Sequence, residues 1–346
     1  MRLRAATILL LLVVFSSPGH SGAAEVVINA VGDVMLAGRW APVIRARGYD
    51  YPFRGVAAEL KAGDVTIANL ESPVATGGRE YREKQFRFRA EPAVAAALKQ
   101  SGIGMVTLAN NHSMDFGEDA LRETMLHLDR AGIDKIGAGM NLDEARQLKL
   151  LDIKGRKVAF LGYSLTRPVE FFAGRERGGT APGYDRYYRE DIRAARRLAD
   201  YVIVSFHWGT EGKSEVQPYQ RDIARKAIDA GADVIIGHHP HVLRGIERYN
   251  GGIIFYSLGN FVFASKSRLA DAGVIVRLRL DGTRREAELL PVDILHRRVG
   301  FQPRRAERMQ AEQIIDRISA LSRPLGTGVA RHGDRYLIDF SHGVGQ

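Results

Sequence analysis

Polar side chains that can bind a metal ion stand directly after the short apolar runs of this sequence. Such runs are followed in five places by acidic, amide or imidazole residues: Asp33, Asn69, Glu71, Asn110, Asn111, His112, His207, His238, His239 and His241. In an open α/β sheet the carboxyl ends of the strands line one crevice, so residues far apart in sequence are expected to converge there. The pattern therefore predicts one site built from five strand ends.

The donor atoms of this set indicate which metal the site would take. Carboxylate oxygen, amide oxygen and imidazole nitrogen suit a divalent transition metal, and the sequence has no cysteine to select copper or an iron–sulfur cluster. Manganese, iron or zinc fits, as one or two ions. Any one of these residues could instead cap a helix or hydrogen-bond a loop. Convergence at five strand ends favours a functional centre.

Other chemistries are excluded by composition or by missing motifs. The absence of cysteine from the sequence rules out disulfides, a cysteine nucleophile and a lipid anchor on cysteine. No Gly-x-Ser-x-Gly elbow supports a serine hydrolase. Residues 137–139, Gly-Ala-Gly, lack the third glycine of a dinucleotide-binding loop and are interpreted as a turn.

A recurring pattern predicts the elements that position the site. Four times a helical stretch closes on a small residue plus glycine before a short β-branched run, which is typical of βαβ units. The strands predicted on this basis cover residues 65–68, 105–108, 136 and 234–236. Further strands are predicted at residues 26–31, 158–161, 201–206, 253–258, 274–280 and 288–294. Residues 281–283, Asp-Gly-Thr, are a hairpin signal, so an α/β sheet is expected to begin with crossovers and end in a meander.

The first residues predict export. Arg2 and Arg4 precede an apolar run over residues 5–15, and small residues follow at 21–24, which is the pattern of a secretory signal. The run is too short to span a bilayer, which needs about 20 apolar residues. We predict a signal peptide over residues 1–24 and a periplasmic or extracellular protein, with an N-terminal membrane tether as the alternative.

The rest of the chain is interpreted as one large domain with a short extension. Residues 25–300 contain all the predicted strands and no low-complexity linker. Residues 301–346 are predicted to be a C-terminal appendage with one helix near residues 314–321.

The formal charge of +10 indicates an anionic partner. No aromatic-interleaved basic motif accompanies it, so we expect no nucleic acid but an anionic envelope polymer or membrane surface. In the basic stretch of residues 79–89, Phe86 and Phe88 alternate with polar residues, which predicts an edge strand. Its charged face, with Arg87 and Arg89, would border the metal site and steer an anionic substrate, or would only be a solvated edge that prevents aggregation.

Several motifs resemble, in content and order, those of the CapA family, which is associated with poly-γ-glutamate and capsule biosynthesis. The motifs are Gly32-Asp33 with Arg39, Asn69-Leu70-Glu71, Ala109-Asn110-Asn111-His112 with Asp115 and Gly117, His207-Trp208-Gly209 with Glu211, Gly237-His238-His239-Pro240-His241-Val242, and Ser257-Leu258-Gly259-Asn260-Phe261. The resemblance covers about residues 26–300. CapA proteins are similar to calcineurin-like metallophosphoesterases, which implies a four-layer α-β-β-α metallophosphoesterase-like sandwich of mixed sheets.

The resemblance also implies a role for each matching residue. Asp33 resembles the first metal-binding aspartate and Asn111 the metal-ligating asparagine. The later ligands would be His207, His239 and His241. His112 resembles the residue that protonates the leaving group or stabilises the transition state, and a histidine pKa suits proton transfer near neutrality.

Two departures from the wider superfamily bear on the metal count. Met35 stands where its Asp-x-His motif has the histidine, so one metal position would lose a strong ligand. The bridging aspartate has no clear match: Asn69 and Glu71 compete, and Glu71 is preferred because a carboxylate can bridge two cations. A single-metal site, or one that binds without turnover, stays open.

Residues around the metal set are predicted to bind the substrate. They are Arg39, Trp208, Glu211, Arg87 and Arg89. Arg39 could clamp an anion or pair with a local acid. A tryptophan such as Trp208 is more often a packing aromatic than a substrate platform, although its place beside His207 adds weight to the second interpretation.

Two functions of different classes fit this sequence. One is a metal-dependent hydrolase or transferase acting on phosphate esters or γ-glutamyl-type polymer chains in the cell envelope. The other is a non-catalytic component that holds an anionic polymer during synthesis or export, together with membrane-bound polymer synthesis machinery. The missing Asp-x-His histidine favours binding, whereas the retained Asn111-His112 pair favours chemistry.

Overall fold

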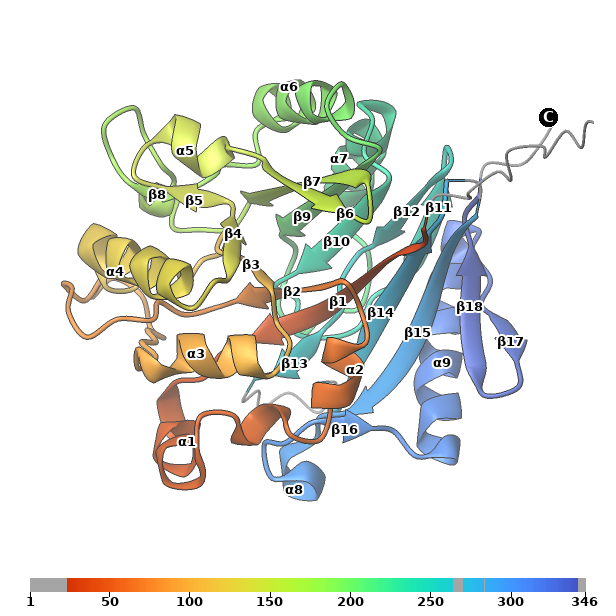
Figure 1. Ribbon diagram of the computed structural model, residues 1–346, viewed down its shortest axis with the longest axis horizontal. Helices are drawn as coiled ribbons and strands as arrows, with labels where there is room; N and C mark the ends of the chain where they lie inside the picture. Colours follow the sequence, from red (N-terminus) through yellow and green to blue (C-terminus); the bar gives the residue numbers. More distant parts are fainter. Residues whose placement is uncertain (1–23, 264–269, 283, 342–346) are drawn as a thin grey trace, which may run out of the picture.

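The computed structural model describes residues 24–263, 270–282 and 284–341. Two mixed β-sheets pack face to face, and helices cover their outer faces (Figure 1). The predicted signal peptide lies outside the described residues apart from its last position. Among the described residues, no helix is long and apolar enough to cross a bilayer.

The first sheet combines a parallel and an antiparallel half. In spatial order its strands are β17 (Ala330–His332), β18 (Arg335–Asp339), β15 (Arg285–Asp293), β14 (Ala272–Leu280), β1 (Val26–Val34), β2 (Val65–Leu70), β3 (Met105–Thr107) and β4 (Asp134–Ile136). Two short strands, β13 (Asn260–Val262) and β16 (Arg304–Arg305), pair with β1 and β15. Strands β1 to β4 run parallel, and β14 pairs antiparallel with both β1 and β15. The predicted change from crossovers to a meander is confirmed.

The second sheet is parallel in its centre. Its strands, in spatial order, are β11 (Ile246–Tyr249), β12 (Gly252–Phe255), β10 (Val234–His238), β9 (Tyr201–His207), β7 (Arg156–Ser164) and β6 (Lys149–Ile153). Strands β7, β9, β10 and β12 are parallel neighbours. A small separate pair joins β5 (Ala138–Gly139) to β8 (Gly179–Thr180). All residues of β9, β10 and β12 are buried, as expected for parallel strands covered on both faces.

Helices occupy the two outer layers. Those of the first half of the chain are α1 (Ala41–Arg47), α2 (Ala57–Lys61), α3 (Ala93–Gln100) and α4 (Gly117–Arg130), and those of the second sheet are α5 (Leu142–Arg146), α6 (Asp185–Arg196) and α7 (Pro218–Asp229). The C-terminal helices are α8 (His296–Val299) and α9 (Arg308–Ser322). Short 3₁₀ turns are η1 (Gly38–Trp40), η2 (Tyr51–Phe53), η3 (Val169–Phe171) and η4 (Arg323–Leu325).

The cores confirm the four-layer order. Between the sheets, Ile28 and Ile67 of the first contact a cluster that includes Phe160 and Ile236 of the second. Outside the first sheet a second cluster includes residues of α1, α3 and α4, and outside the second sheet a third includes residues of α6 and α7. Each fully buried aliphatic or aromatic side chain contributes about 1.5–3 kcal/mol, so the layers are fixed mainly by these three cores.

The segment after residue 300 packs onto the first sheet. Strands β16 and β18 pair with β15, and Ile314, Ile315 and Ile318 of α9 belong to the cluster between the sheets. Helix α9 contacts both β15 and β11, so it covers the inner face of the antiparallel half (Figure 1). The domain boundary placed at residue 300 stays a prediction.

The helix-closing glycines behave as predicted at three of four positions. Gly102, Gly132 and Gly231 have positive φ angles of 103°, 67° and 118°, which glycine adopts without steric cost. Gly63 does not have positive φ. A Cβ there would lie 2.7 Å from Nδ2 of Asn29, so close packing explains this glycine instead.

The edge strand predicted within residues 79–89 was wrong. These residues form turns and extended backbone without a strand. The Tyr81 amide donates to the Asp115 carbonyl (2.9 Å), and the Phe88 amide donates to the Asp115 carboxylate (2.9 Å). The segment gives backbone hydrogen bonds to the loop after β3. It therefore packs over that loop as extended backbone, and the alternation of its side chains does not indicate a sheet edge.

Candidate metal centre

The polar residues predicted from the strand ends come together where the two sheets meet. Asp33 at the end of β1 lies in register with Asn69 of β2 and with Asn260 of β13. His207 at the end of β9 lies in register with His238 of β10. The two sheets are joined here directly, since His238 Nδ1 lies 3.2 Å from Asp33 Oδ1.

One group of ligands surrounds Asp33. Ligand atoms of Asp33, Glu71 and His241 all lie within 4.8 Å of one another. His241 Nδ1 is 3.1 Å from Asp33 Oδ2, and His241 Nε2 is 3.8 Å from Glu71 Oε1. Asn260 also approaches this histidine, with Oδ1 2.9 Å from Nδ1.

A second group shares Glu71 with the first. Ligand atoms of Glu71, His207 and His239 also lie within 4.8 Å of one another. His207 Nε2 is 2.8 Å from Asn111 Oδ1 and 3.6 Å from Glu71 Oε1, so the predicted asparagine ligand belongs to this group. The two groups therefore have one carboxylate in common, at the position where Asn69 and Glu71 competed as the bridging residue.

Asn69 has another task. Its amide nitrogen donates to Asp33 Oδ1 (2.9 Å) and to Glu71 Oε2 (3.2 Å). Its own oxygen accepts from the side chain of Asn110 (3.0 Å). These contacts orient both carboxylates from behind, so Asn69 and Asn110 position the centre.

Several buried polar atoms of the centre have no hydrogen-bond partner. They include Glu71 Oε1 and His239 Nδ1, whereas Asp33 Oδ2 faces His241 Nδ1 at 3.1 Å. The carboxylates of Asp33 and Glu71 are fully buried, and a buried carboxylate oxygen left without a partner costs several kcal/mol. A divalent cation would satisfy these atoms at once, so the residues present fit the metal predicted from the donor set.

The loop after β10 holds its histidines in a strained conformation. His239 has φ of 94° and His241 has φ of 59°, in the left-handed region that non-glycine residues avoid. Each such residue costs on the order of 1–3 kcal/mol, which persists when the surroundings fix the geometry. In this conformation a His241 nitrogen lies 3.1 Å from Asp33, and a His239 nitrogen lies within 4.8 Å of Glu71.

Burial and neighbouring charges shift the pKa values of the residues in the centre in different directions. Burial alone would raise the pKa of Asp33, but hydrogen bonds and positive charge from His238 and His241 outweigh it and hold that pKa well below its usual range. Burial raises the pKa of Glu71 well above its usual range. Burial would lower the pKa of His241, but the charges of Glu71 and Asp33 raise it to about 9. Burial and the charge of His241 lower the pKa of His239 to about 3.

His112 lies beside this centre in the loop after β3. Its Nδ1 is 2.7 Å from Asp115 Oδ2, and its backbone amide donates to Asn110 Oδ1 (3.0 Å). Burial lowers the pKa of His112 although Asp115 opposes the shift. With Nδ1 turned to Asp115, Nε2 is the ring atom left for a substrate oxygen.

Lys84 completes this arrangement and was not predicted to act on His112. Its ammonium is 2.5 Å from Asp115 Oδ1 and 3.1 Å from His112 Nδ1, and it also donates to the Asn111 carbonyl. The basic segment therefore does border the centre, but through Lys84.

The predicted substrate arginines lie elsewhere on that segment and near η1. Arg87 pairs with Glu80 (2.8 Å), and Arg89 donates to the Gly77 carbonyl (3.0 Å) and lies over the Phe116 ring. Arg39 is exposed, and its charge acts on His296. None of these contacts involves the two ligand groups, and substrate binding by the three arginines stays a prediction.

Trp208 is placed in the core. It is fully buried, stacks on Phe206 with ring centroids 4.8 Å apart, and donates its indole N–H to the Tyr256 carbonyl (3.1 Å). Packing is therefore its observed role in this conformation. Glu211, in contrast, is exposed and lies next to His239 and His241.

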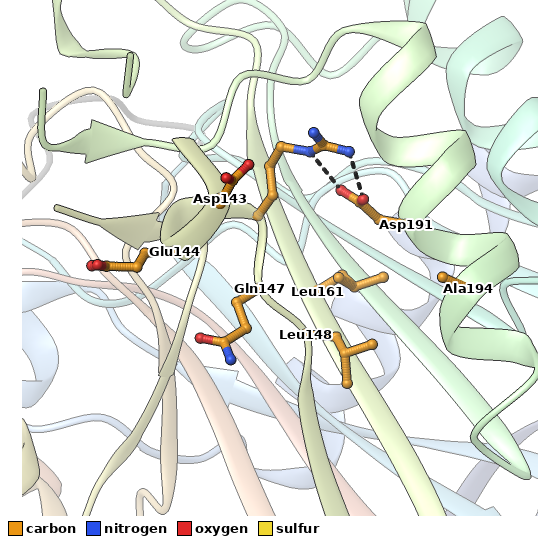
Figure 2. Close-up of a pocket in the computed structure, with 8 residues that line it drawn as sticks. Asp143, Glu144, Gln147, Leu148, Leu161, Asp191 and Ala194 are labelled. Carbon is orange, nitrogen blue, oxygen red and sulfur yellow. Dashed lines mark hydrogen bonds and ion pairs between the residues drawn. The ribbon is translucent and has the colours of Figure 1, made fainter. Parts of the chain in front are cut away.

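A separate hollow of about 460 Å³ lies between α5 and α6, away from these residues (Figure 2). Two of its charged residues pair with each other: Arg146 pairs with Asp191 (2.7 Å), and Asp191 also accepts from the Tyr163 hydroxyl (2.7 Å). Nothing there resembles the unpartnered buried atoms of the metal centre.

A sequence model of the family described as "Bacterial capsule synthesis protein PGA_cap" matches residues 27–265. The chain belongs to this family. The predicted resemblance to CapA proteins is thereby confirmed.

Named relatives agree with the family. The chain is 35% identical over 269 residues to the "PGA biosynthesis protein CapA" of Bacillus subtilis, a match covering 76% of this chain and 70% of that protein. It is 33% identical to the "Capsule biosynthesis protein CapA" of Bacillus anthracis, covering 76% of this chain and 66% of that protein. A "Probable polyglutamine synthesis accessory protein" of Mycobacterium tuberculosis is 30% identical, with 81% and 78% covered.

Solved structures with a similar chain course include nucleotidases. The Haemophilus influenzae NAD nucleotidase matches with a TM-score of 0.47 at 12% identity, covering 85% of this chain and 62% of that one. A 5'-nucleotidase precursor of Thermus thermophilus matches with a TM-score of 0.44 at 11% identity, covering 75% and 52%.

Met35, which stands where the superfamily motif has a histidine, packs in the core of this protein. Met35 is 2% exposed in the core outside the first sheet, and its sulfur accepts from the Ala37 amide (3.3 Å). Hence the Asp33 group gains no nitrogen ligand from this position.

Proposed function

We propose that this chain is a metal-dependent hydrolase or transferase of phosphoesterase type that works in the synthesis of an anionic envelope polymer. The observation that supports the proposal most is the position of Glu71. Its buried carboxylate belongs both to the group with Asp33 and His241 and to the group with His207 and His239. One carboxylate shared by two ligand groups suits two neighbouring divalent ions, the arrangement that stabilises attacking and leaving oxygens of a displacement.

When bound, a divalent ion such as Mn²⁺, Fe²⁺ or Zn²⁺ polarises the scissile bond and activates water. Asp33, Glu71 and His241 would hold one ion, and Glu71, Asn111, His207 and His239 the other. Asn69 keeps the two carboxylates oriented through its side-chain amide. These groups are largely buried, and Asn111, His239 and His241 keep a small exposed fraction on the solvent side.

His112 would donate a proton to the leaving oxygen. Since burial lowers its pKa, the ring is mostly neutral near pH 7 and has to gain a proton before it can give one. An anionic substrate oxygen beside the ring raises the pKa again, which couples protonation to substrate binding. Asp115 keeps the ring oriented, with Oδ2 2.7 Å from Nδ1.

The test measures metal content and turnover in the same preparations. Mature protein loaded with Mn²⁺ or Zn²⁺ is expected to hydrolyse a generic aryl phosphate and to lose this activity with chelator. His112→Ala should keep the metal and lower the rate by about 10²- to 10⁴-fold. His239→Ala should lose metal and rate together.

His127→Ala is the matched control, because His127 contacts Glu123 of the same helix, α4, and neither ligand group. It should behave as wild type. Metal-loaded wild type without any turnover of phosphate esters or γ-glutamyl chains would contradict the enzymatic proposal.

A binding component is the second candidate, and the structure of the Asp33 group favours it in one respect. Because Met35 supplies no ligand, this group would hold a cation with fewer donors than the group around His207. A protein that binds an anionic polymer through a cation would tolerate this. In that case His112→Ala at normal protein level would leave envelope polymer in the cell unchanged.

The substrate class and the compartment are part of the proposal. The names of the Bacillus relatives refer to PGA and capsule biosynthesis, which supports an anionic polymer as substrate or product. The residues at the N-terminus support export to the periplasm or beyond. Cell fractionation tests export: protein with residues 1–24 should be found outside the cytoplasm, and protein lacking them should stay inside.

A further inference from the structure

Glu211 reaches the metal centre from its solvent side. It lies four residues after the end of β9, and its carboxylate is within 4.8 Å of ligand atoms of both His239 and His241. His239 belongs to one buried ligand group and His241 to the other. Glu71 and Glu211 thus each contact residues of both groups, Glu71 from the buried side and Glu211 from the exposed side.

The loop that carries Glu211 is fixed although the side chain is exposed. Arg244 is 1% exposed and donates to the backbone carbonyls of Thr210 (3.2 Å) and Lys213 (2.9 Å), on either side of Glu211. The Gly212 amide donates to the Pro240 carbonyl (2.8 Å), between the two histidines. A buried arginine and this hydrogen bond therefore hold residue 211 against the His239–His241 turn.

The two buried groups leave room for a further ligand on this side. His239 is 8% exposed and its Nδ1 has no partner. The Asp33 group has three donors, whereas zinc takes four ligands and manganese commonly six.

We propose that Glu211 is a metal ligand of this centre, supplied from the β9–α7 loop and closing its open side. The assignment rests on the proposed function, since it requires the centre to bind divalent ions. It gives Glu211 a role different from the substrate contact predicted from the sequence. The ligand that Met35 does not provide is then replaced by a carboxylate from the other sheet.

The experiment titrates metal-free protein with Mn²⁺ or Zn²⁺ by calorimetry, and elemental analysis gives the bound stoichiometry. Glu211→Gln removes the negative charge and one carboxylate oxygen and leaves only a weaker amide oxygen donor, with little change of size. Glu215→Gln is the matched control, because Glu215 is an exposed glutamate of the same loop and belongs to neither ligand group. Glu211→His restores a ligand without the negative charge.

We expect Glu211→Gln to bind at least one ion about 10-fold or more weakly than wild type, by analogy with losses at groups that support metal ligands. Glu215→Gln should match wild type, and Glu211→His should recover part of the lost affinity. The Co²⁺-loaded proteins supply a second measurement: the visible absorption of Glu211→Gln should differ from that of wild type, and that of Glu215→Gln should not.

The outcomes separate this role from the proposed function. Equal metal affinity in wild type, Glu211→Gln and Glu215→Gln overturns the ligand role and leaves the enzyme proposal intact. Equal weakening in Glu211→Gln and Glu211→His shows that Glu211 acts only through its charge and also overturns it. A wild type that binds no metal overturns both.

Discussion

Two buried glutamates of this protein have opposite surroundings. Glu247 of β11 is 1% exposed, and its Oε1 accepts from Arg221 (2.9 Å) and from Arg225, while Oε2 accepts from the Tyr256 hydroxyl (2.6 Å). Glu71 is fully buried, and its Oε1 has no hydrogen-bond partner. Burial tends to raise both pKa values, but hydrogen bonds from Arg225, Tyr256 and Arg221 lower that of Glu247, whereas that of Glu71 stays raised.

Glu247 is a structural carboxylate whose partners all come from the protein, whereas Glu71 has an oxygen that the protein leaves without a hydrogen bond. A buried charge is retained either because the chain satisfies it or because something else does. Arginines of α7 satisfy Glu247. His207 and His241 lie 3.6 and 3.8 Å from the free oxygen of Glu71, and both belong to the proposed ligand groups. The same Glu→Gln substitution at both positions tests this difference.

The largest difference is expected in metal affinity. Glu71→Gln removes the carboxylate shared by both groups, so Mn²⁺ or Zn²⁺ should bind at least about 100-fold more weakly, beyond the loss seen for supporting groups. Glu247→Gln should bind metal as wild type does. Calorimetric titration of metal-free protein measures both. Similar affinities in the two variants would show that Glu71 is not a ligand.

The next effect is the stabilisation that metal provides. At a free metal concentration of 100 Kd, binding to the folded state should raise the free energy of unfolding by about 2.7 kcal/mol. This increase is expected in wild type and in Glu247→Gln, and it should be absent in Glu71→Gln at the same metal concentration. Urea unfolding with metal and with chelator gives the values. Loss of the increase in Glu247→Gln would mean that the two regions are coupled.

Without metal, the two substitutions should change stability in opposite directions. Glu247→Gln gives the arginines of α7 a neutral amide oxygen in place of a charged carboxylate and should cost roughly 1–3 kcal/mol. Glu71→Gln removes a buried charge with an unpartnered oxygen and should stabilise the metal-free protein by about 1 kcal/mol at neutral pH, as functional residues often reduce stability. Urea unfolding in chelator distinguishes them. Destabilisation by Glu71→Gln would indicate that neighbouring histidines already satisfy its charge.

Much of the fold could be predicted from the sequence because its signals are local. The apolar runs became β1, β2, β3, β7, β9 and β10, and the polar residues directly after them converged because parallel strands end at one edge. The sequence also predicts that Glu71 is shared by two ligand groups, since a carboxylate is preferred over Asn69 as a bridge between two cations.

The parts that could not be predicted depend on contacts distant in sequence. Lys84 contacts Asp115 across 31 positions, and alternation in its segment indicated a strand instead of a cover over His112. In the sequence nothing distinguishes Arg244 from an exposed arginine, but in the structure it is buried and holds the loop of Glu211. His238 contacts Asp33 from the end of β10, whereas the positions of His239 and His241 depend on their positive φ angles, which no residue type encodes.

The smallest expected effect is the pH dependence of the contribution of Glu247 to the free energy of unfolding. Its folded-state pKa is lowered from the ordinary value of 4.5: burial opposes the shift, but hydrogen bonds from Arg225, Tyr256 and Arg221 outweigh it. A carboxyl with a depressed folded pKa contributes stability that is fully present above the unfolded pKa and is lost as pH falls through the folded pKa. The difference in unfolding free energy between metal-free wild type and Glu247→Gln should therefore be constant above about pH 5.5 and shrink below about pH 4.5.

Solvent limits the size of this effect, because the side chains of Arg221 and Arg225 are 40% and 37% exposed. The corresponding difference for Glu71 should run the other way. Its pKa is raised by burial, so the cost of its charge appears only as pH rises above the unfolded pKa near 4.5. Urea unfolding of the three metal-free proteins from about pH 3.5 to 7 measures both trends, and parallel curves for the two variants would remove the distinction between a satisfied and an unsatisfied carboxylate.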